Sequence, residues 1–260
     1  MRRGLNQSGR FGRTRVRILH ASARAVWGLA LSILPIASTW TGAGATTPPL
    51  IVSTTTTTIH QSPVFLRFGQ FGPSVRKVQW RLALLGYWLG TPNGVYGDST
   101  EQAVFAFKKT AGLPRDGIVG PAMQRALIGG IRPHPHSTQG HVIEVNLYRD
   151  LVMSVINGKV QWVFNTSTGG GYTYSSGGVT SVATTPTGHF TIQREINGLV
   201  TAPLGQLWRP KYFYSGFAIH GDSYVPAVPV SHGCVRLSNE AISFVWNQNL
   251  APIGTSVWIY

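Results

Sequence analysis

The sequence contains a single cysteine, Cys234, among its 260 residues. One cysteine cannot form a disulfide within the chain, so a disulfide-stapled fold is excluded. In a protein that leaves the cytoplasm, a lone cysteine either pairs with another molecule or stays a free thiol available for chemistry. Cys234 is therefore the first residue whose role needs an explanation.

Acidic residues are also scarce, with 8 Asp+Glu against 22 Lys+Arg and a net charge of +14. Seven arginines and no acid lie in the first 45 residues, so the remainder of the chain carries +7. A charge of this size favours contact with an anionic surface such as a cell envelope. Nucleic-acid binding is not expected, because the N-terminal arginines precede an apolar segment and would be lost with it on cleavage.

The apolar run near the N-terminus is too short to span a bilayer. It consists of the thirteen residues "AVWGLALSILPIA" from Ala25 to Ala37, whereas a spanning helix needs about 20. An arginine-rich start, this short run and the small-residue site Ala43-Gly44-Ala45 predict a secretory signal peptide over residues 1–45. We expect export to the extracytoplasmic cell envelope; an uncleaved N-terminus would instead anchor the protein by transient membrane contact.

The next segment, residues 46–65, contains no Asp, Glu, Lys or Arg and has the composition of a linker. It contains five consecutive threonines and three prolines. Such a composition favours an extended chain that packs poorly. We therefore expect a Thr/Pro linker here.

Between residues 66 and 130 the apolar residues recur at helical spacing. One helical face is formed by four of them: Val75, Val78, Leu82 and Leu85. Asp98, with Glu101 three positions later, resembles a capping box at the start of a second helix. Gly120 followed by Pro121 suits the start of a third helix, which Gly129-Gly130 would end. The segment predicts three short helices.

The helical segment also repeats internally. "GVYGDSTEQAV" at residues 94–104 aligns with "GIVGPAMQRAL" at residues 117–127, which indicates a duplicated helical unit. Together with "VRKVQWRLALLGYW", these stretches resemble the three-helix peptidoglycan-binding module of bacterial wall hydrolases and transpeptidases. Lys108 stands where that family usually has glutamine. The resemblance implies peptidoglycan, both stem peptides and glycan, as the partner; a helical spacer without a ligand is the alternative.

From about His141 the apolar pattern changes to period two, which is typical of strands. Asn157-Gly158 between two alternating runs predicts a two-residue hairpin. "TGGGYTYSSGG" predicts glycine-rich turns, Ser238-Asn239 precedes a helix, and "TSVWIY" closes the chain as a strand. The predicted fold class is α+β with two domains: a small three-helix bundle at residues 66–130, then a mainly β, sandwich-like domain at residues 139–260.

Three interpretations of Cys234 compete. It is a small buried hydrophobe, a metal ligand beside His220 and His232, or a nucleophile. The first fits poorly, because "SHGC" joins a polar Ser-His pair to a glycine and so indicates a turn rather than a strand running through a core. The second lacks an accompanying Cys-x-x-Cys or His-Glu-x-x-His motif, so no metal is expected.

The nucleophile interpretation requires a base or a positive field near the thiol, since a free thiol is only a few per cent thiolate at neutral pH. His220, His232 and Arg236 supply both. Gly233 allows a tight turn, after which the amides of Gly233 and Cys234 can point at a developing oxyanion.

Two stretches around Cys234 resemble one enzyme family. "IHG" at residues 219–221 and "SHGCVRLSN" at residues 231–239 are similar to the signature of the L,D-transpeptidase (YkuD-type) catalytic domain. "TTPTGHFTI" and "YSGFAIHG" are similar to its flanking strands. The resemblance implies that residues 139–260 form such a domain.

Carried over to matching positions, the resemblance implies that Cys234 is the nucleophile and His220 its general base and later acid. Gly221 would orient the imidazole through its carbonyl, His232 would support the site, and the amides of Gly233 and Cys234 would form the oxyanion hole. The residues expected to bind substrate are Arg236, Ser231 and Tyr214. No cofactor is expected.

The implied reaction is a 3-3 peptidoglycan cross-linking in cell-wall biogenesis, through a Cys thioester and with loss of D-Ala from a tetrapeptide stem. A hydrolytic L,D-carboxypeptidase would use the same residues with water as acceptor. A non-catalytic peptidoglycan-binding protein is the third hypothesis, which the joint presence of His220, His232, Gly233 and Cys234 disfavours. The role of Asp222 stays undecided: it is either an acidic partner of His220 or a solvent-facing residue.

Overall fold

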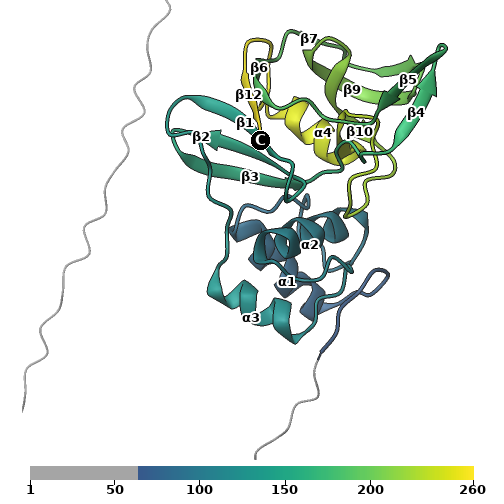
Figure 1. The fold of residues 1–260 in the computed structure, drawn as a ribbon. Helices are drawn as coiled ribbons and strands as arrows, with labels where there is room; N and C mark the ends of the chain where they lie inside the picture. Colours follow the sequence, from purple (N-terminus) through teal and green to yellow (C-terminus); the bar gives the residue numbers. More distant parts are fainter. Residues whose placement is uncertain (1–63) are drawn as a thin grey trace, which may run out of the picture. The chain divides into compact units, whose positions relative to one another are not determined.

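A computed structural model describes residues 64–260 (Figure 1). The predicted signal peptide, and the predicted linker up to residue 63, lie outside the described residues. The helices are α1 (Pro73–Leu84), α2 (Asp98–Ala111), α3 (Pro121–Gly129) and α4 (Asn239–Asn247). The strands are β1 (His141–Asn146), β2 (Leu151–Ile156), β3 (Lys159–Asn165), β4 (Thr173–Ser176), β5 (Val179–Val182), β6 (Gly188–Thr191), β7 (Arg194–Glu195), β8 (Leu199–Ala202), β9 (Gly205–Tyr214), β10 (Phe217–Asp222), β11 (Val235–Ser238) and β12 (Ser256–Ile259).

The three helices predicted in residues 66–130 are confirmed as α1, α2 and α3. Their shared core includes Val75 and Leu82, as the helical spacing indicated. Pro121 begins α3 and Gly130 ends it in the left-handed conformation. The capping box is wrong: Gly97 is the N-cap of α2, and no side chain caps the helix.

The first sheet has the strand order β3-β2-β1-β12-β6. The predicted hairpin turn at Asn157-Gly158 is confirmed between β2 and β3, and both of its residues have positive φ, as a two-residue turn of this kind requires. The predicted closing strand is β12, which pairs in parallel with β1. The C-terminus is thereby held in the middle of this sheet.

The second sheet has the order β11-β10-β9-β7, with β8 also paired to β9. Apolar residues of both sheets and of α4 form one core cluster, which includes Val145, Ile219 and Ile242. Ser238 caps α4 by accepting a 3.2 Å hydrogen bond from the amide of Ala241. Two facing sheets with a helix packed on their core agree with the predicted α+β class.

The helical part and the first sheet share a hydrophobic core. One cluster joins residues of α1–α3 with β2 and β3, including Phe107, Met153 and Val163. The stretch Gly86–Trp88 also pairs with the edge of β3, where the Trp88 amide donates to the Val163 carbonyl at 3.0 Å. Gly86 has φ +81°, and a Cβ there would lie 2.9 Å from the Gln161 carbonyl, so this approach requires glycine. In Figure 1 α2 accordingly lies next to β3.

Lys109 of α2 is buried where the helical part meets the β part. Its ammonium donates to the carbonyls of Asp150 at 3.1 Å and Thr166 at 2.9 Å. Burial lowers the pKa of Lys109 to about 7, because desolvation penalises the charged form more than the nearby Asp150 favours it.

This burial predicts a pH-dependent stability. Between pH 7 and 9.5 the unfolded chain holds a proton on Lys109 that the folded protein has released, so the free energy of unfolding rises with pH. We expect Lys109→Met to reduce this rise by a few kcal/mol, at about 1.4 kcal/mol per pKa unit. Urea unfolding at both pH values measures it. The exposed Lys77 gives the control Lys77→Met, and an equal rise in all three proteins would contradict the prediction.

Candidate active site

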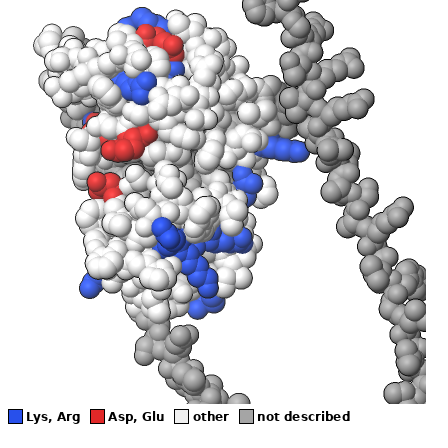
Figure 2. Space-filling view, turned by 180° about the vertical axis from the view of Figure 1, so that it is seen from behind, with Lys and Arg blue, Asp and Glu red and all other residues white. Residues whose placement is uncertain are grey.

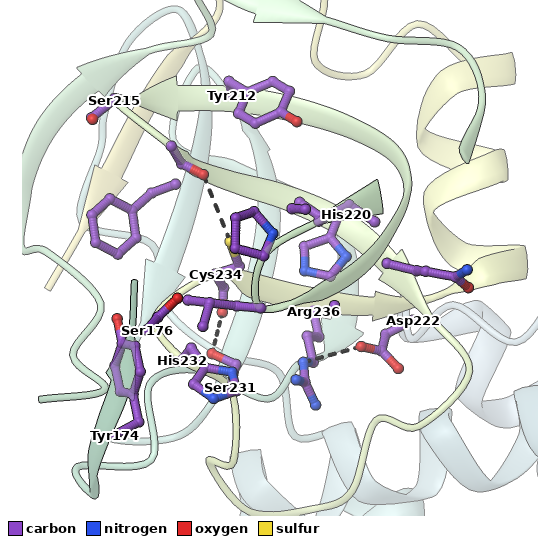
Figure 3. A pocket seen from close by; sticks show the side chains of 18 residues that line it. Tyr174, Ser176, Tyr212, Ser215, His220, Asp222, Ser231, His232, Cys234 and Arg236 are labelled. Atoms are coloured by element: carbon purple, nitrogen blue, oxygen red, sulfur yellow. Dashed lines mark hydrogen bonds and ion pairs between the residues drawn. The ribbon is translucent and has the colours of Figure 1, made fainter. Parts of the chain in front are cut away.

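The candidate active site forms on two parallel neighbouring strands, β10 and β11. His220 pairs with Arg236 in their register. Side chains two residues apart on a strand face the same side, so Asp222 joins His220 on that face, and Cys234, just before β11, joins Arg236. All four side chains line one cavity of about 600 Å³ (Figure 3).

The walls of this cavity come from two β-hairpins. The β4–β5 hairpin contributes Tyr174 and Ser176, and the β8–β9 turn contributes residues 202–207. The sequence predicted only glycine-rich turns in the first segment, whereas Thr173–Ser176 pairs with Val179–Val182 and leaves the turn to two glycines. The hairpin places aromatic and hydroxyl side chains beside the thiol.

His220 is 4% exposed and held in one orientation. Its Nδ1 lies 2.8 Å from the Gly221 carbonyl oxygen. Because a carbonyl only accepts, Nδ1 carries the hydrogen and Nε2 is left with its lone pair. Burial lowers the pKa of His220, although the Gly221 carbonyl and Asp222 oppose this effect. The imidazole is therefore neutral near pH 7 and able to take a proton.

Close packing requires glycine at position 221, whose carbonyl also orients His220. A Cβ at this position would lie 2.6 Å from Asn239 Oδ1 and 2.7 Å from Ile242 Cγ2. Any side chain would push β10 away from α4, and the carbonyl that holds His220 would move with it. The tight fit thus keeps the imidazole in place.

Cys234 is half-buried, and its thiol is free. Burial raises the pKa of the thiol, while a backbone hydrogen bond at Ala218 and the charge of Arg236 lower it. The Sγ lies 4.0 Å from the Gly216 carbonyl oxygen. Burial is the largest of these effects, so the resting group is a neutral thiol rather than a preformed thiolate.

The turn that carries Cys234 is fixed by its own hydrogen bonds. The Ser231 hydroxyl donates to the Cys234 carbonyl at 2.6 Å and accepts from the Gly233 amide at 3.0 Å. Gly233 has φ +134°, and a Cβ there would lie 2.5 Å from the Phe217 ring, so only glycine fits. The Thr185 hydroxyl donates to the Gly233 carbonyl at 2.8 Å. Sequence reasoning quoted Thr185 only as part of the stretch "TTPTGHFTI" and gave it no role in the site, because its contact with Gly233 joins positions 48 apart.

These hydrogen bonds affect the roles expected of Gly233, as an oxyanion-hole donor, and of Ser231, as a substrate-binding residue. The Gly233 amide is engaged by Ser231 and does not point freely into the cavity. The Ser231 hydroxyl has both its donor and an acceptor role filled within the turn. Both residues therefore shape the turn around Cys234.

Arg236 and Asp222 form an ion pair beside His220. Arg236 Nε lies 3.1 Å from Asp222 Oδ2, and Figure 3 shows both groups at the cavity wall. The sequence did not decide whether Asp222 is an acidic partner of His220 or a solvent-facing residue. Its carboxylate pairs with Arg236, so it acts on His220, two residues away on β10, through its charge.

His232 lines the same cavity as His220 and Cys234. Its ring packs edge-on against Tyr174, with centroids 4.7 Å apart, and against Tyr172, at 5.5 Å. These contacts connect the turn to the β4–β5 hairpin. The resemblance implied that His232 supports the site by hydrogen bonding, and this role stays a prediction.

Of the three residues expected to bind substrate, Arg236 and Ser231 line the cavity and Tyr214 does not. It is 48% exposed and packs against Phe190 and Phe217, while Tyr212 lines the cavity. Register shifts between β9 and β10 separate the two tyrosines. Strand periodicity alone could not predict such a shift.

Within residues 64–260, no group of three or more His, Cys, Asp or Glu side chains is placed to hold a metal ion. No helix in this part of the chain is long and apolar enough to cross a membrane.

Comparison with known proteins identifies both parts of the chain. Residues 71–127 match a putative peptidoglycan binding domain, and residues 140–259 match the L,D-transpeptidase catalytic domain. The structure superposes on the crystal structure of the L,D-transpeptidase (residues 123–326) from Xylanimonas cellulosilytica with a TM-score of 0.75 and 45% identity, over 77% of this chain and 99% of that one. The chain therefore belongs to the L,D-transpeptidase family.

Two curated relatives from Bacillus licheniformis match shorter regions. A probable N-acetylmuramoyl-L-alanine amidase is 37% identical over 86 residues, which are 32% of this chain and 24% of the amidase. The N-acetylmuramoyl-L-alanine amidase CwlL is 39% identical over 94 residues, 33% of this chain and 26% of CwlL. The chain thus spans about a quarter of the length of these amidases.

Proposed function

We propose that the protein is a cell-wall L,D-transpeptidase that forms 3-3 peptidoglycan cross-links through a thioester on Cys234. One observation carries the proposal: His220 and Cys234 face the same cavity, with the imidazole oriented by the Gly221 carbonyl at 2.8 Å. Nucleophile, base and orienting group are the parts that cysteine acyl transfer needs.

In the first step, the Cys234 thiol attacks the carbonyl of the third, diamino-acid residue of a stem tetrapeptide. His220 Nε2 takes the thiol proton as the C–S bond forms, because both groups are neutral at rest. The Cys234 amide is the donor we assign to the oxyanion, since the Gly233 amide is engaged by Ser231. The C–N bond to the terminal D-Ala then breaks, and His220 returns the proton to the leaving amine.

In the second step, the amine of a neighbouring stem attacks the thioester. His220 accepts a proton from that amine, the C–S bond breaks, and the proton passes to the departing sulfur. The thiolate is a good leaving group, so one difficult exchange of peptide bonds becomes two easier steps. The energy of the first peptide bond is conserved in the thioester and then in the cross-link.

Arg236 is positioned by Asp222 at the cavity wall, and we assign it to a carboxylate of the donor stem. We assign Ser231 to fixing the turn, because its hydroxyl bonds lie within it. Tyr212, which lines the cavity, replaces Tyr214 as the aromatic contact for substrate.

The experiment that tests the proposal follows the wild-type protein with a soluble disaccharide-tetrapeptide by mass spectrometry. A cross-linked dimer with loss of D-Ala, together with a thioester or carbapenem adduct mapped to the peptide that contains Cys234, would support it. Tripeptide alone would identify a hydrolytic L,D-carboxypeptidase. Activity that requires added zinc, or no product and no adduct, would overturn the proposal.

We assign the helical domain to wall binding and the whole protein to the exported cell envelope. On the face shown in Figure 2, acidic side chains are few, and basic ones gather in the lower half, where the helical part lies. This charge suits an anionic cell wall. Phe71 is 83% exposed and lines a groove of about 390 Å³ with polar neighbours such as Gln70 and Ser74.

A binding experiment tests the assignment of the groove. We expect Phe71→Ala to reduce co-sedimentation of the protein with purified peptidoglycan severalfold, because an exposed aromatic side chain in a groove marks an interaction surface. Ile128 lies in the same domain and is 80% exposed, so Ile128→Ala is the matched control. Equal sedimentation of all three proteins would place the binding surface elsewhere.

A further inference from the structure

The loop between the two catalytic strands is held by the helical domain. This loop, residues 223–230 and hereafter the β10–β11 loop, connects the end of the His220 strand to the turn that carries Cys234. The Gln102 side chain of α2 donates to the Val225 carbonyl in this loop at 2.9 Å. Arg115, just after α2, donates to the Ala227 carbonyl at 3.1 Å.

Both side chains are themselves fixed by residues of the β part. The Gln102 carbonyl oxygen accepts a hydrogen bond from the Asn165 amide at 2.6 Å. Arg115 lies 3.6 Å from the buried carboxylate of Asp150. Each side chain therefore contacts the loop and a residue of the β part at the same time.

The packing between the β10–β11 loop and α2 is incomplete, although Val225 and Ala227 are buried. A cavity of about 650 Å³ lies between the loop and the helix, lined by Gln102 and Arg115 on one side and by residues 222–228 on the other. The donors and acceptors of the two hydrogen bonds belong to residues that line this cavity. The β part holds the loop as well, since Asn165 Nδ2 lies 3.3 Å from the Val225 carbonyl oxygen and the Ser167 hydroxyl donates to the Val228 carbonyl at 2.8 Å. We therefore expect Gln102 and Arg115 to set the loop position together with these bonds.

A second set of hydrogen bonds connects the helical domain to the turn that carries Cys234. Lys109 donates to the Thr166 carbonyl at 2.9 Å. The chain after Thr166 pairs with the site, since the Ser231 amide donates to the Thr168 carbonyl at 2.9 Å and the Arg236 amide donates to the Ser167 carbonyl at 3.1 Å. The helical domain therefore contacts both segments that support the nucleophile.

We infer that the helical domain is a structural part of the catalytic unit, in addition to any role in wall binding, and that Gln102 and Arg115 are positioning residues for Cys234. The inference rests on the proposed function for its substrate. It implies that these residues affect turnover of a small soluble substrate, which needs no wall binding. Replacing Gln102 or Arg115 should lower kcat rather than raise KM, because these residues fix the nucleophile turn and do not line the substrate cavity.

The test measures two quantities in the full protein: kcat and KM for a soluble disaccharide-tetrapeptide, and the rate of Cys234 alkylation by iodoacetamide. We expect Gln102→Ala and Arg115→Ala each to lower kcat about tenfold or more, because misplacement by 1 Å costs up to about a hundredfold. KM should stay within about twofold of the wild type, and alkylation should change at least about threefold, since the thiol environment moves.

Conservative variants separate positioning from folding. Gln102→Glu keeps the volume and the acceptor for Asn165 but loses the donor to Val225, so it should show the same loss of kcat even if Gln102→Ala unfolds. Arg115→Lys retains a donor and should recover part of the activity. The matched controls are Gln124→Ala and Arg125→Ala in α3, where Gln124 bonds within the helical domain and Arg125 is exposed.

The outcomes distinguish this inference from the proposed function. A wild type that turns over no tetrapeptide, with Cys234 alkylation still altered in Gln102→Glu, would overturn the proposed function and support the positioning role. Unchanged kcat and unchanged alkylation in Gln102→Glu and Arg115→Ala, with only a lower melting temperature, would show that these hydrogen bonds are merely structural and overturn the inference.

Discussion

Cys234→Ala is expected to abolish both the covalent adduct and the cross-linked product. The thiol is the one group in the described cavity that can form a thioester, and the turn around it is fixed by Ser231 and Thr185 through backbone carbonyls rather than through the sulfur. Removing the nucleophile of an acyl-transfer site lowers kcat by about 10⁴-fold or more. Intact-protein mass spectrometry after exposure to a carbapenem measures the adduct directly.

The same substitution should leave the fold unchanged. Cys234 is half-buried, and the substitution removes one atom from the wall of a cavity. The melting temperature should therefore stay within a few degrees of the wild-type value. Product formation by a folded Cys234→Ala protein at more than about a hundredth of the wild-type rate would rule out the thioester mechanism.

His220→Gln is expected to lower the rate of Cys234 acylation by about 10²–10⁴-fold, the usual contribution of a general base. Burial keeps the thiol protonated at rest, so the attack depends on a group that can accept its proton. Glutamine fills a similar volume but cannot accept a proton near neutral pH. Stopped-flow or quenched measurements of acylation by a carbapenem report this step alone.

The pH profile gives a second readout of His220. Its pKa is lowered by burial, so the neutral base persists below the ordinary histidine value, and wild-type acylation should decline only as pH falls below about 6.5. This acid limb should disappear in His220→Gln. The matched control is His232→Gln, which loses ring contacts with Tyr172 and Tyr174 and should keep the acid limb. An acid limb that vanishes in His232→Gln and persists in His220→Gln would reverse the two assignments.

Local sequence signals predicted the elements that short-range chemistry controls. Asn157-Gly158 produced the hairpin because both positions need positive φ, which these two residues tolerate best. Gly120 and Pro121 marked the start of α3 for a similar reason. The capping box failed because Gly97 in extended conformation already begins α2, so Asp98 falls inside the helix instead of before it.

The candidate site was predictable where its residues are close in the chain. Alternation on paired strands brings His220 and Cys234 to one cavity, and the spacing of "IHG" and "SHGCVRLSN" encodes that pair. The partner of Arg236 was not predictable, because Asp222 could satisfy its charge with solvent equally well until β10 and β11 pair. The place of Tyr214 depended on a register shift in β9, which leaves no sequence signal.

The sequence by itself determined the three short helices and the β-rich second half, and it singled out the residues that we propose as nucleophile and base, since each depends on residues within one segment or one motif. Tertiary structure alone decided that the helical domain shares a core with β2 and β3 and that Gln102 reaches Val225, 123 positions away. Such contacts depend on which surfaces meet once the chain has folded. Hydrogen bonds between a glutamine and a backbone carbonyl require no particular residue at the carbonyl, so no pattern in the sequence records them.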